Sequence, residues 1–173
     1  MKASTIALCA SVPLAFYFET GATAQAAQFV AERSSKHGSW AAHLFRNLNG
    51  NRLFCAIESR NGTTDFRINQ YKVSGEAFLE LFNPTWTMME GNVRFTIDFK
   101  VGSENYQAEF AGRSWGDSYT HDFTDVTNYH AVLGLIAKAD AFSVRNSNGS
   151  IIAEFTGSGS SAAIRSYATC LSE

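Results

Sequence analysis

Proline, cysteine and charge are all scarce in this sequence of 173 residues, which has two prolines, three cysteines and only 17% charged residues. Disordered chains are rich in proline and charge and poor in apolar side chains, so a chain with 45% hydrophobic residues is expected to fold. The net charge is −2 and no basic stripe is present. The composition therefore gives no reason to expect a nucleic-acid partner.

Long hydrophobic runs are also missing, apart from an uncharged stretch at residues 5–18. This stretch is shorter than the roughly 20 apolar residues that a membrane-spanning helix needs. Lys2 precedes it, and the A-x-A patterns Ala22-Thr23-Ala24 and Ala24-Gln25-Ala26 follow it. A positive start, an apolar centre and small residues at the end are typical of a secretory signal peptide. We predict a signal peptide over residues 1–26, a periplasmic or secreted protein, and no membrane span after cleavage; a retained anchoring helix is the alternative.

The few cysteines agree with export. Cys9 lies in the predicted signal peptide, so Cys55 and Cys170 remain as an even pair. Such a pair in an oxidising compartment is expected to form a disulfide, and two buried free thiols are the alternative. Neither the cysteines nor the four histidines have a metal-ligand spacing, and we expect no metal and no other cofactor.

Alternation of apolar and polar residues predicts strands along much of the chain. The clearest case is Val93–Lys100, where every second residue is apolar and the residues between them are polar or charged. Asn61-Gly62 and Asn148-Gly149 lie between such runs, as in hairpin turns. Further strands are predicted at residues 40–44, 52–58, 65–71, 77–82, 106–110, 141–145 and 150–155.

Two segments have a helical period instead. Tyr129, Val132, Leu133 and Ile136 are spaced to share one face of a helix, and residues 161–171 form a second helix that directs Cys170 inward. With six to eight strands, the fold class is all-β or β-dominated α+β: an antiparallel sandwich or partly open barrel with two short helices, the last at the C-terminus. Residues 27–38 lack periodicity and are interpreted as a flexible leader, and residues 39–173 as a single domain.

The most polar, aromatic-rich stretch offers weak catalytic candidates. It contains Gly116-Asp117-Ser118, which resembles the serine motif of some hydrolases, with His121 and Asp122 nearby. A catalytic triad is an arrangement in space, so closeness in sequence does not establish one. The alternatives are a small exported hydrolase that uses Ser118 and His121, or an ordinary loop or strand whose polar residues face water.

Aromatic and methionine side chains give a second candidate. Trp86, Met88 and Met89 follow Asn83-Pro84 in an expected loop, and Trp115 lies further along the chain. If exposed, these side chains mark an interaction site, while packing in the core is the alternative. We hypothesise a non-enzymatic binding protein whose partner is another protein. An inhibitor of a lysozyme or protease that presents residues 83–91 is a further possibility.

The chain also resembles a known family in its order of short motifs. Gly38-Ser39-Trp40 follows the signal peptide, and Leu53–Ile57 is a strand that carries a cysteine. Near the end, Ile151–Phe155 is followed by Gly157-Ser158 and by Ala162-Ala163-Ile164 in a helix. This layout is similar to the invasion-associated locus B group of exported proteins in α-proteobacteria. The resemblance implies an envelope or secreted protein, linked in some cases to host-cell entry, and it implies no catalytic residues.

Overall fold

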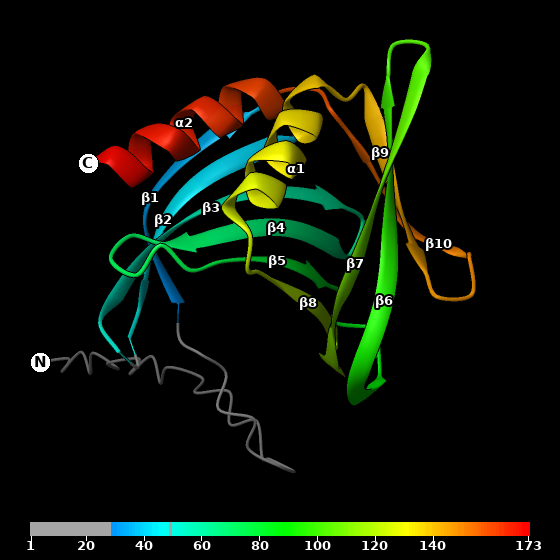
Figure 1. Cartoon of the computed structure of the whole chain (residues 1–173). Coiled ribbons are helices and arrows are strands. Elements are labelled where there is room, and N and C mark those ends of the chain that lie inside the picture. The colour runs from blue at the N-terminus through cyan, green and yellow to red at the C-terminus, as the bar shows by residue number, and fades with distance from the viewer. Residues whose placement is uncertain (1–28, 49) are drawn as a thin grey trace, which may run out of the picture.

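A computed structural model describes residues 29–48 and 50–173. The predicted signal peptide lies outside the described residues. The described residues form ten strands and two helices, which are labelled in Figure 1. In chain order these are β1 (Phe29–His37), β2 (Trp40–Asn47), β3 (Arg52–Asn61), β4 (Thr64–Tyr71), β5 (Ala77–Phe82), β6 (Met88–Val101), β7 (Glu104–Gly116), β8 (Ser118–Phe123), α1 (Val126–Lys138), β9 (Ala141–Asn146), β10 (Ile151–Thr156) and α2 (Ser160–Ser172).

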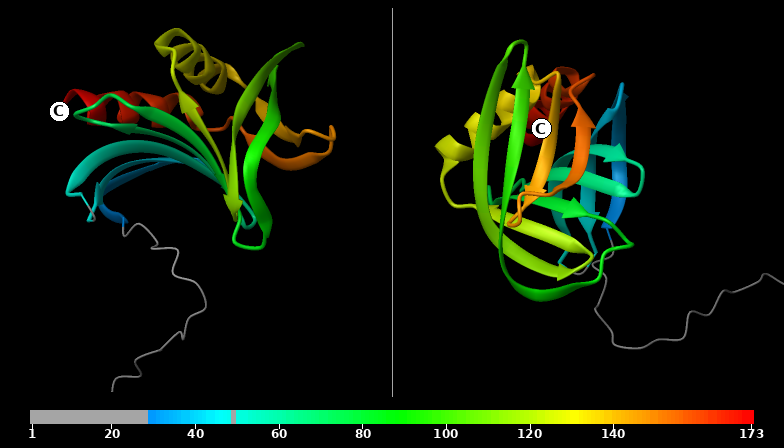
Figure 2. Two further views of the ribbon diagram at one scale, coloured as in Figure 1. Left: turned by 60° about the horizontal axis from the view of Figure 1, so that its bottom comes forward. Right: turned by 90° about the vertical axis from the view of Figure 1, so that its right-hand side faces the viewer.

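All the strands belong to one antiparallel sheet in the order β1-β2-β3-β4-β5-β8-β7-β6-β9-β10. The sheet curves into a half-barrel, and both helices lie on its concave side (Figures 1 and 2). The expected β-dominated α+β class, the partly open barrel and the C-terminal helix are therefore confirmed. The strands number ten rather than six to eight, because β1 and β8 were not predicted as strands.

The structure corrects our interpretation of residues 27–38 as a flexible leader. From Phe29 it forms β1, which pairs with β2 from Phe29↔Asn47 to His37↔Trp40. Strand alternation is not visible in this segment because β1 is an edge strand with exposed polar residues on both faces. A bulge between Ala31 and Arg33 also interrupts the period.

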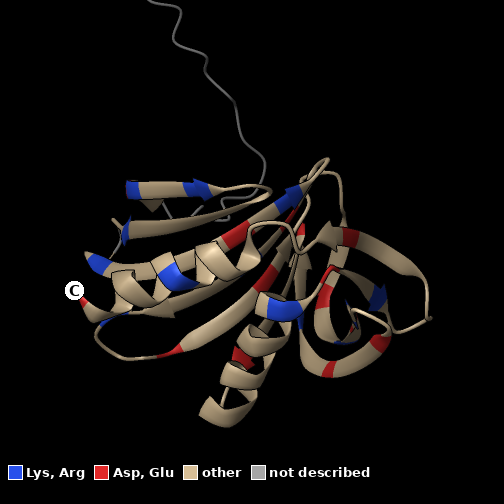
Figure 3. Ribbon diagram, turned by 90° about the horizontal axis from the view of Figure 1, so that it is seen from above, with Lys and Arg blue, Asp and Glu red and all other residues tan. Residues whose placement is uncertain are grey.

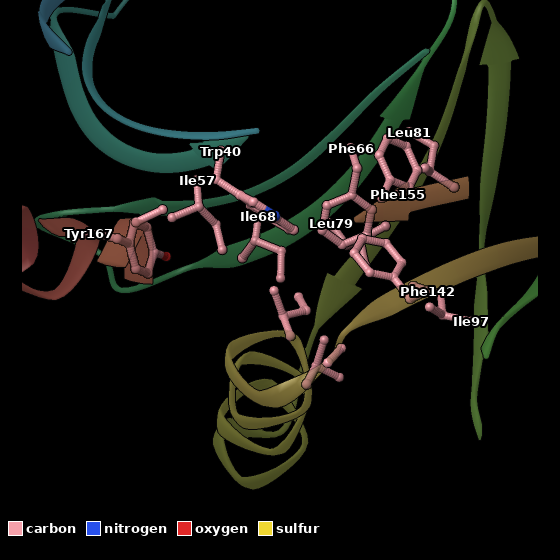
Figure 4. Packing of buried hydrophobic residues seen from close by; sticks show 14 of the residues in the cluster. Trp40, Ile57, Phe66, Ile68, Leu79, Leu81, Ile97, Phe142, Phe155 and Tyr167 are labelled. Carbon is pink, nitrogen blue, oxygen red and sulfur yellow. The ribbon is translucent and has the colours of Figure 1, made fainter. Parts of the chain in front are cut away.

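The core lies between the concave face of the sheet and the helices (Figure 4). At one end it is aromatic: the ring centroids of Phe66 and Phe142 are 4.9 Å apart, and those of Phe142 and Phe155 are 5.1 Å apart. Phe66 lies on β4, whereas the other two lie on β9 and β10. These contacts hold the last two strands against the early ones, although β10 does not pair with β3 in the sheet.

The helices follow their predicted faces. Asp125 caps α1 by accepting a hydrogen bond from the backbone N–H of Thr127, and the buried side of α1 includes Val132 and Ile136. In α2 the buried stripe ends at Cys170, whose Sγ is bonded to that of Cys55 on β3. The predicted disulfide is therefore present and fastens the last helix to an early strand.

Two glycines allow α2 to begin close to the rest of the chain. A Cβ on Gly157 would lie 1.6 Å from the carbonyl oxygen of Ala139. A Cβ on Gly159 would lie 1.8 Å from the carbonyl oxygen of His37, and Gly159 has a φ of +96°. Only glycine fits at both positions, so this segment packs closely on β1 and on the end of α1.

Candidate functional site

The predicted catalytic residues all lie on β8, where they do not converge. Alternate residues of a strand point to opposite faces of the sheet, so Ser118 and Asp122 face outward while His121 faces the concave side. His121 Nδ1 contacts the carbonyl oxygen of Ala111 at 2.7 Å. The outward Ser118 Oγ donates to the neighbouring Asp117 carboxylate at 3.1 Å.

The other contacts of His121 and Asp122 are packing and pairing contacts within the sheet. The His121 ring packs against Phe110 and Phe123, each with a centroid distance of 5.0 Å. Asp122 pairs across strands with Arg113 at 3.5 Å on the exposed surface. A serine nucleophile needs a base within hydrogen-bond reach, and His121 is on the other face of the sheet from Ser118. The geometry supports a strand with water-facing polar residues rather than a triad.

The predicted interaction residues, in contrast, come together at one end of the half-barrel. Met88 at the start of β6 pairs with Gly116 at the end of β7, and Gly91 pairs with Ser114. Between these two pairs Met89 and Glu90 lie opposite the single residue Trp115, which defines a β-bulge. We call Met88, Met89 and Trp115 the methionine–tryptophan tip.

Exposure distinguishes the members of this surface. Met89 is 91% exposed and Trp115 is 64% exposed, whereas Met88 is half-buried. Trp86 is half-buried as well, because it packs against the core with its ring 5.4 Å from that of Tyr119. Trp86 therefore anchors the segment before β6, and the exposed apolar surface is provided by Met89 and Trp115.

Hydrogen bonds hold the methionine–tryptophan tip in place. Ser114 Oγ is buried and donates to the carbonyl oxygen of Met89 at 2.7 Å. The backbone N–H of Asn83 donates to the carbonyl oxygen of Asp117 at 2.9 Å, which ties the segment after β5 to the β7–β8 turn. The two exposed side chains are thus presented from paired strands, which reduces the entropy lost when a partner binds.

A groove of about 980 Å³, which we call the seam groove, lies where β10 meets the end of β3 and is lined by both charged and aromatic side chains. Its charged lining includes Arg60, Asp98, Lys100, Arg145 and Glu154, and the sequence analysis did not identify it. The residues come from β3, β6, β9 and β10, which are far apart in the chain, so no local motif indicates the groove. Asp98 and Arg145 neutralise each other at 2.6 Å, which leaves a mixed lining without one dominant charge. Figure 3 likewise shows Lys and Arg interspersed with Asp and Glu over the fold.

An ion-pair network lies on the convex face of β3, β4 and β5. Arg67 contacts Glu58 and Asp65 at 2.8 Å and Glu80 at 3.6 Å, and Arg60 also binds Asp65. Burial raises the pKa of the Glu80 carboxyl, and the charge of Arg67 partly opposes that shift. Each acid has an arginine partner here, so the network stabilises the sheet and provides no free reactive group.

Among residues 29–48 and 50–173, no group of three or more His, Cys, Asp or Glu side chains is arranged to hold a metal ion. In the same part of the chain, no helix has the length and apolar character needed to cross a membrane.

The comparisons with known proteins add no assignment. No family model matches the chain, and neither a curated protein nor a solved structure matches it significantly.

Proposed function

We propose that the protein is an exported, non-enzymatic binding protein of the bacterial envelope, which contacts another protein through the methionine–tryptophan tip. The observation that carries this proposal is the position of exposed Met89 opposite exposed Trp115 in the β-bulge between β6 and β7. Tryptophan is enriched among residues that dominate binding energy. Methionine adapts its shape to irregular apolar surfaces, so the pair suits a protein partner.

Export is the second part of the proposal. It is supported by the signal-peptide layout of residues 1–26 and by the Cys55–Cys170 disulfide, since disulfides persist in oxidising compartments. The resemblance to the invasion-associated locus B group agrees with an envelope or secreted location and with a link to host association. Fractionation of the native cells should recover the protein in the periplasm or medium, with its N-terminus at Gln25 or Ala27. Recovery of the uncleaved chain in the cytoplasm would contradict export.

The binding surface can be tested by crosslinking the processed protein in an envelope extract. Wild type, the double variant Met89→Ser/Trp115→Ser and the control Val126→Ser should be compared by quantitative mass spectrometry. Val126 is 66% exposed and lies at the start of α1, outside the methionine–tryptophan tip. We expect one partner to be captured by wild type and the control and lost with the double variant. Equal capture by all three proteins would rule out this surface.

A further inference from the structure

Strand β7 has a long stretch of edge that no other strand covers. It pairs with β6 over its whole length. In the part of the chain that the structure describes, β8 pairs with it only over residues 113–115. Residues 104–110 therefore have β6 on one side and no strand on the other, and we call them the open edge of β7. In the right-hand view of Figure 2, β7 lies at the outer border of this part of the sheet.

The point where β8 leaves β7 is marked by His121. Its Nδ1 contacts the carbonyl oxygen of Ala111 at 2.7 Å, so this carbonyl points away from β6 and meets a side chain instead of a strand. Along a strand, the backbone groups of alternate residues point to the same side. The N–H and C=O groups of Asn105, Gln107 and Glu109 therefore also point away from β6. Among the described residues, no backbone hydrogen bond joins these groups to another element.

The two outer edges of the sheet are protected, whereas the open edge of β7 is not. On β10, the carbonyl oxygens of Glu154 and Thr156 already accept hydrogen bonds from the side chains of Asn61 and Trp40. On β1, a bulge interrupts the strand near its start. Bulges, prolines and lysines are common means by which edge strands avoid pairing with other chains. Residues 104–110 contain no proline or lysine, and their register with β6 has no bulge.

The open edge has one apolar face and one polar face. Tyr106, Ala108 and Phe110 lie opposite buried residues of β6, on the core side of the sheet. Phe110 is buried, Ala108 is half-buried and Tyr106 is 42% exposed, so this apolar row becomes more accessible towards the β6–β7 turn. The residues between them are polar and exposed. An added strand would therefore place apolar side chains beside Tyr106 and polar side chains on the other face.

The charge of this edge favours a foreign segment over a second copy of the chain. Glu104 and Glu109 are both exposed, and no lysine or arginine of the described residues forms an ion pair with either carboxylate. Pairing of two open edges would bring four carboxylates together, and like charges on neighbouring strands are destabilising. A segment that carries lysine or arginine would instead complement this charge.

We propose that the open edge of β7 binds an extended segment of a partner protein, which joins the sheet as a further strand. The segment alternates apolar and polar residues and carries a lysine or arginine on its polar side. Its backbone completes the hydrogen bonds of Asn105, Gln107 and Glu109, and its apolar side chains cover Tyr106. Main-chain hydrogen bonds supply the affinity in this mode of recognition, and alternate side chains supply the specificity. The site is separate from the methionine–tryptophan tip, which lies at the other end of the β6–β7 hairpin.

Amide hydrogen exchange measured by NMR tests the proposal with the chain from Ala27 onward, which contains every described strand and helix. The probe is the peptide acetyl-Lys-Val-Thr-Val-Arg-Val-Thr-amide, and a peptide of the same composition with its valines adjacent is the control. We expect the amides of Asn105, Gln107 and Glu109 to exchange fast in the free protein and to be protected by the alternating peptide alone. The amide of Ala108 should be protected throughout, because it faces β6.

A proline substitution removes one outward N–H and leaves the pairing with β6 in place. Gln107→Pro should weaken peptide binding about tenfold or more, because proline is tolerated on the open side of an edge strand but cannot donate. Gln107→Ala is the matched control, since it removes the same side chain, with its hydrogen bond to Asp98, and keeps the N–H. Its binding should stay near that of wild type. Asn105→Pro and Asn105→Ala form a second pair if Gln107→Pro does not fold.

Thermal unfolding shows whether each variant is folded, and sedimentation velocity gives the oligomeric state. Equal weakening in the proline and alanine variants, or no protection of the three outward amides at millimolar peptide, would overturn the proposal. A dimer of the free protein that is lost in Gln107→Pro would also overturn it, because the second copy would then be the occupant. Met89→Ser/Trp115→Ser should bind the peptide like wild type, and a loss of binding there would place the peptide on the methionine–tryptophan tip instead.

Discussion

The indole Nε1 of Trp40 donates a hydrogen bond of 2.8 Å to the carbonyl oxygen of Thr156, which joins β2 to β10. Beside it, Asn61 Nδ2 donates to the carbonyl oxygen of Glu154 at 2.7 Å. The strands involved lie at opposite ends of the sheet order and do not pair with each other. Side chains therefore close the seam of the half-barrel at positions where a complete barrel would have backbone pairing.

Removing the Trp40 contact should weaken the seam. Trp40→Phe deletes the donor and part of a fully buried ring, so we expect a loss of about 2 kcal/mol in the free energy of unfolding, measured by urea denaturation. Asn61→Ala is the matched control, because it removes an exposed donor to the same strand and should cost about 0.5–1 kcal/mol. A Trp40→Phe protein as stable as wild type would show that the seam does not depend on this residue.

Loss of the disulfide should be more damaging. Cys55 and Cys170 are 115 residues apart, and a crosslink over a loop of this size is worth about 4–5 kcal/mol in the chain-entropy model, with measured losses of about 2–5 kcal/mol. We expect Cys55→Ala/Cys170→Ala to remain folded at low temperature with a clearly lower Tm in differential scanning calorimetry. Reductant should lower the Tm of wild type and leave that of the variant unchanged. A wild-type mass that does not increase by two hydrogens on reduction would contradict the bond.

The stability of the fold should depend on pH through His43. Burial lowers the pKa of the His43 imidazole below its ordinary value of 6.5, while Glu58 partly opposes that shift. As the pH falls through 6.5, the unfolded chain therefore takes up a proton that the folded protein still excludes, and stability falls until the folded-state pKa is reached. Urea denaturation at pH 7.5 and 5.5 should show this loss, and His43→Gln should reduce it. An unchanged pH dependence in His43→Gln would assign the effect to other groups.

Substitution of Arg67 should lower the free energy of unfolding more than substitution of Arg60, the other arginine of the ion-pair network. It is half-buried and contacts three carboxylates, so Arg67→Met leaves Asp65 and Glu80 short of positive charge. We expect a loss of about 2–4 kcal/mol at neutral pH. Because the pKa of Glu80 is already raised, acidification should protonate it and reduce the cost of the substitution.

The exposed Arg60 provides the comparison for this network. Arg60→Met removes another partner of Asp65 but leaves Arg67 in place, and an exposed ion pair contributes about 0.2–1 kcal/mol. Chemical denaturation of both variants at pH 7 and pH 5 distinguishes them. If Arg60→Met proves the more destabilising of the two, the central role assigned to Arg67 is wrong.

Much of the fold follows from local patterns in the sequence. The alternation of Val93–Lys100 predicts a strand with one dry face, and Phe95, Ile97 and Phe99 are indeed buried. Strand β6 begins earlier than predicted, at Met88. Its first residues were missed because the bulge before Gly91 interrupts the alternation of apolar and polar residues. Local periodicity therefore finds the centres of elements and misses irregular ends.

The surfaces were only partly predictable for the same reason. Trp86, Met88 and Met89 are close in sequence, and their grouping could be proposed directly, although Trp86 serves as a core anchor. The seam groove is assembled from strands that are far apart in the chain, so no local pattern in the sequence indicates it.

The position of Cys55 and Cys170 in the chain also determines when folding can be completed. A chain that is made or translocated from its N-terminus presents Cys55 while its partner is still 115 residues away. The Cys55 thiol must stay free, or form a mixed disulfide with another molecule, until α2 has been synthesised or translocated. The disulfide thus forms only after α2 is present, and a product truncated before Cys170 would leave Cys55 without its partner.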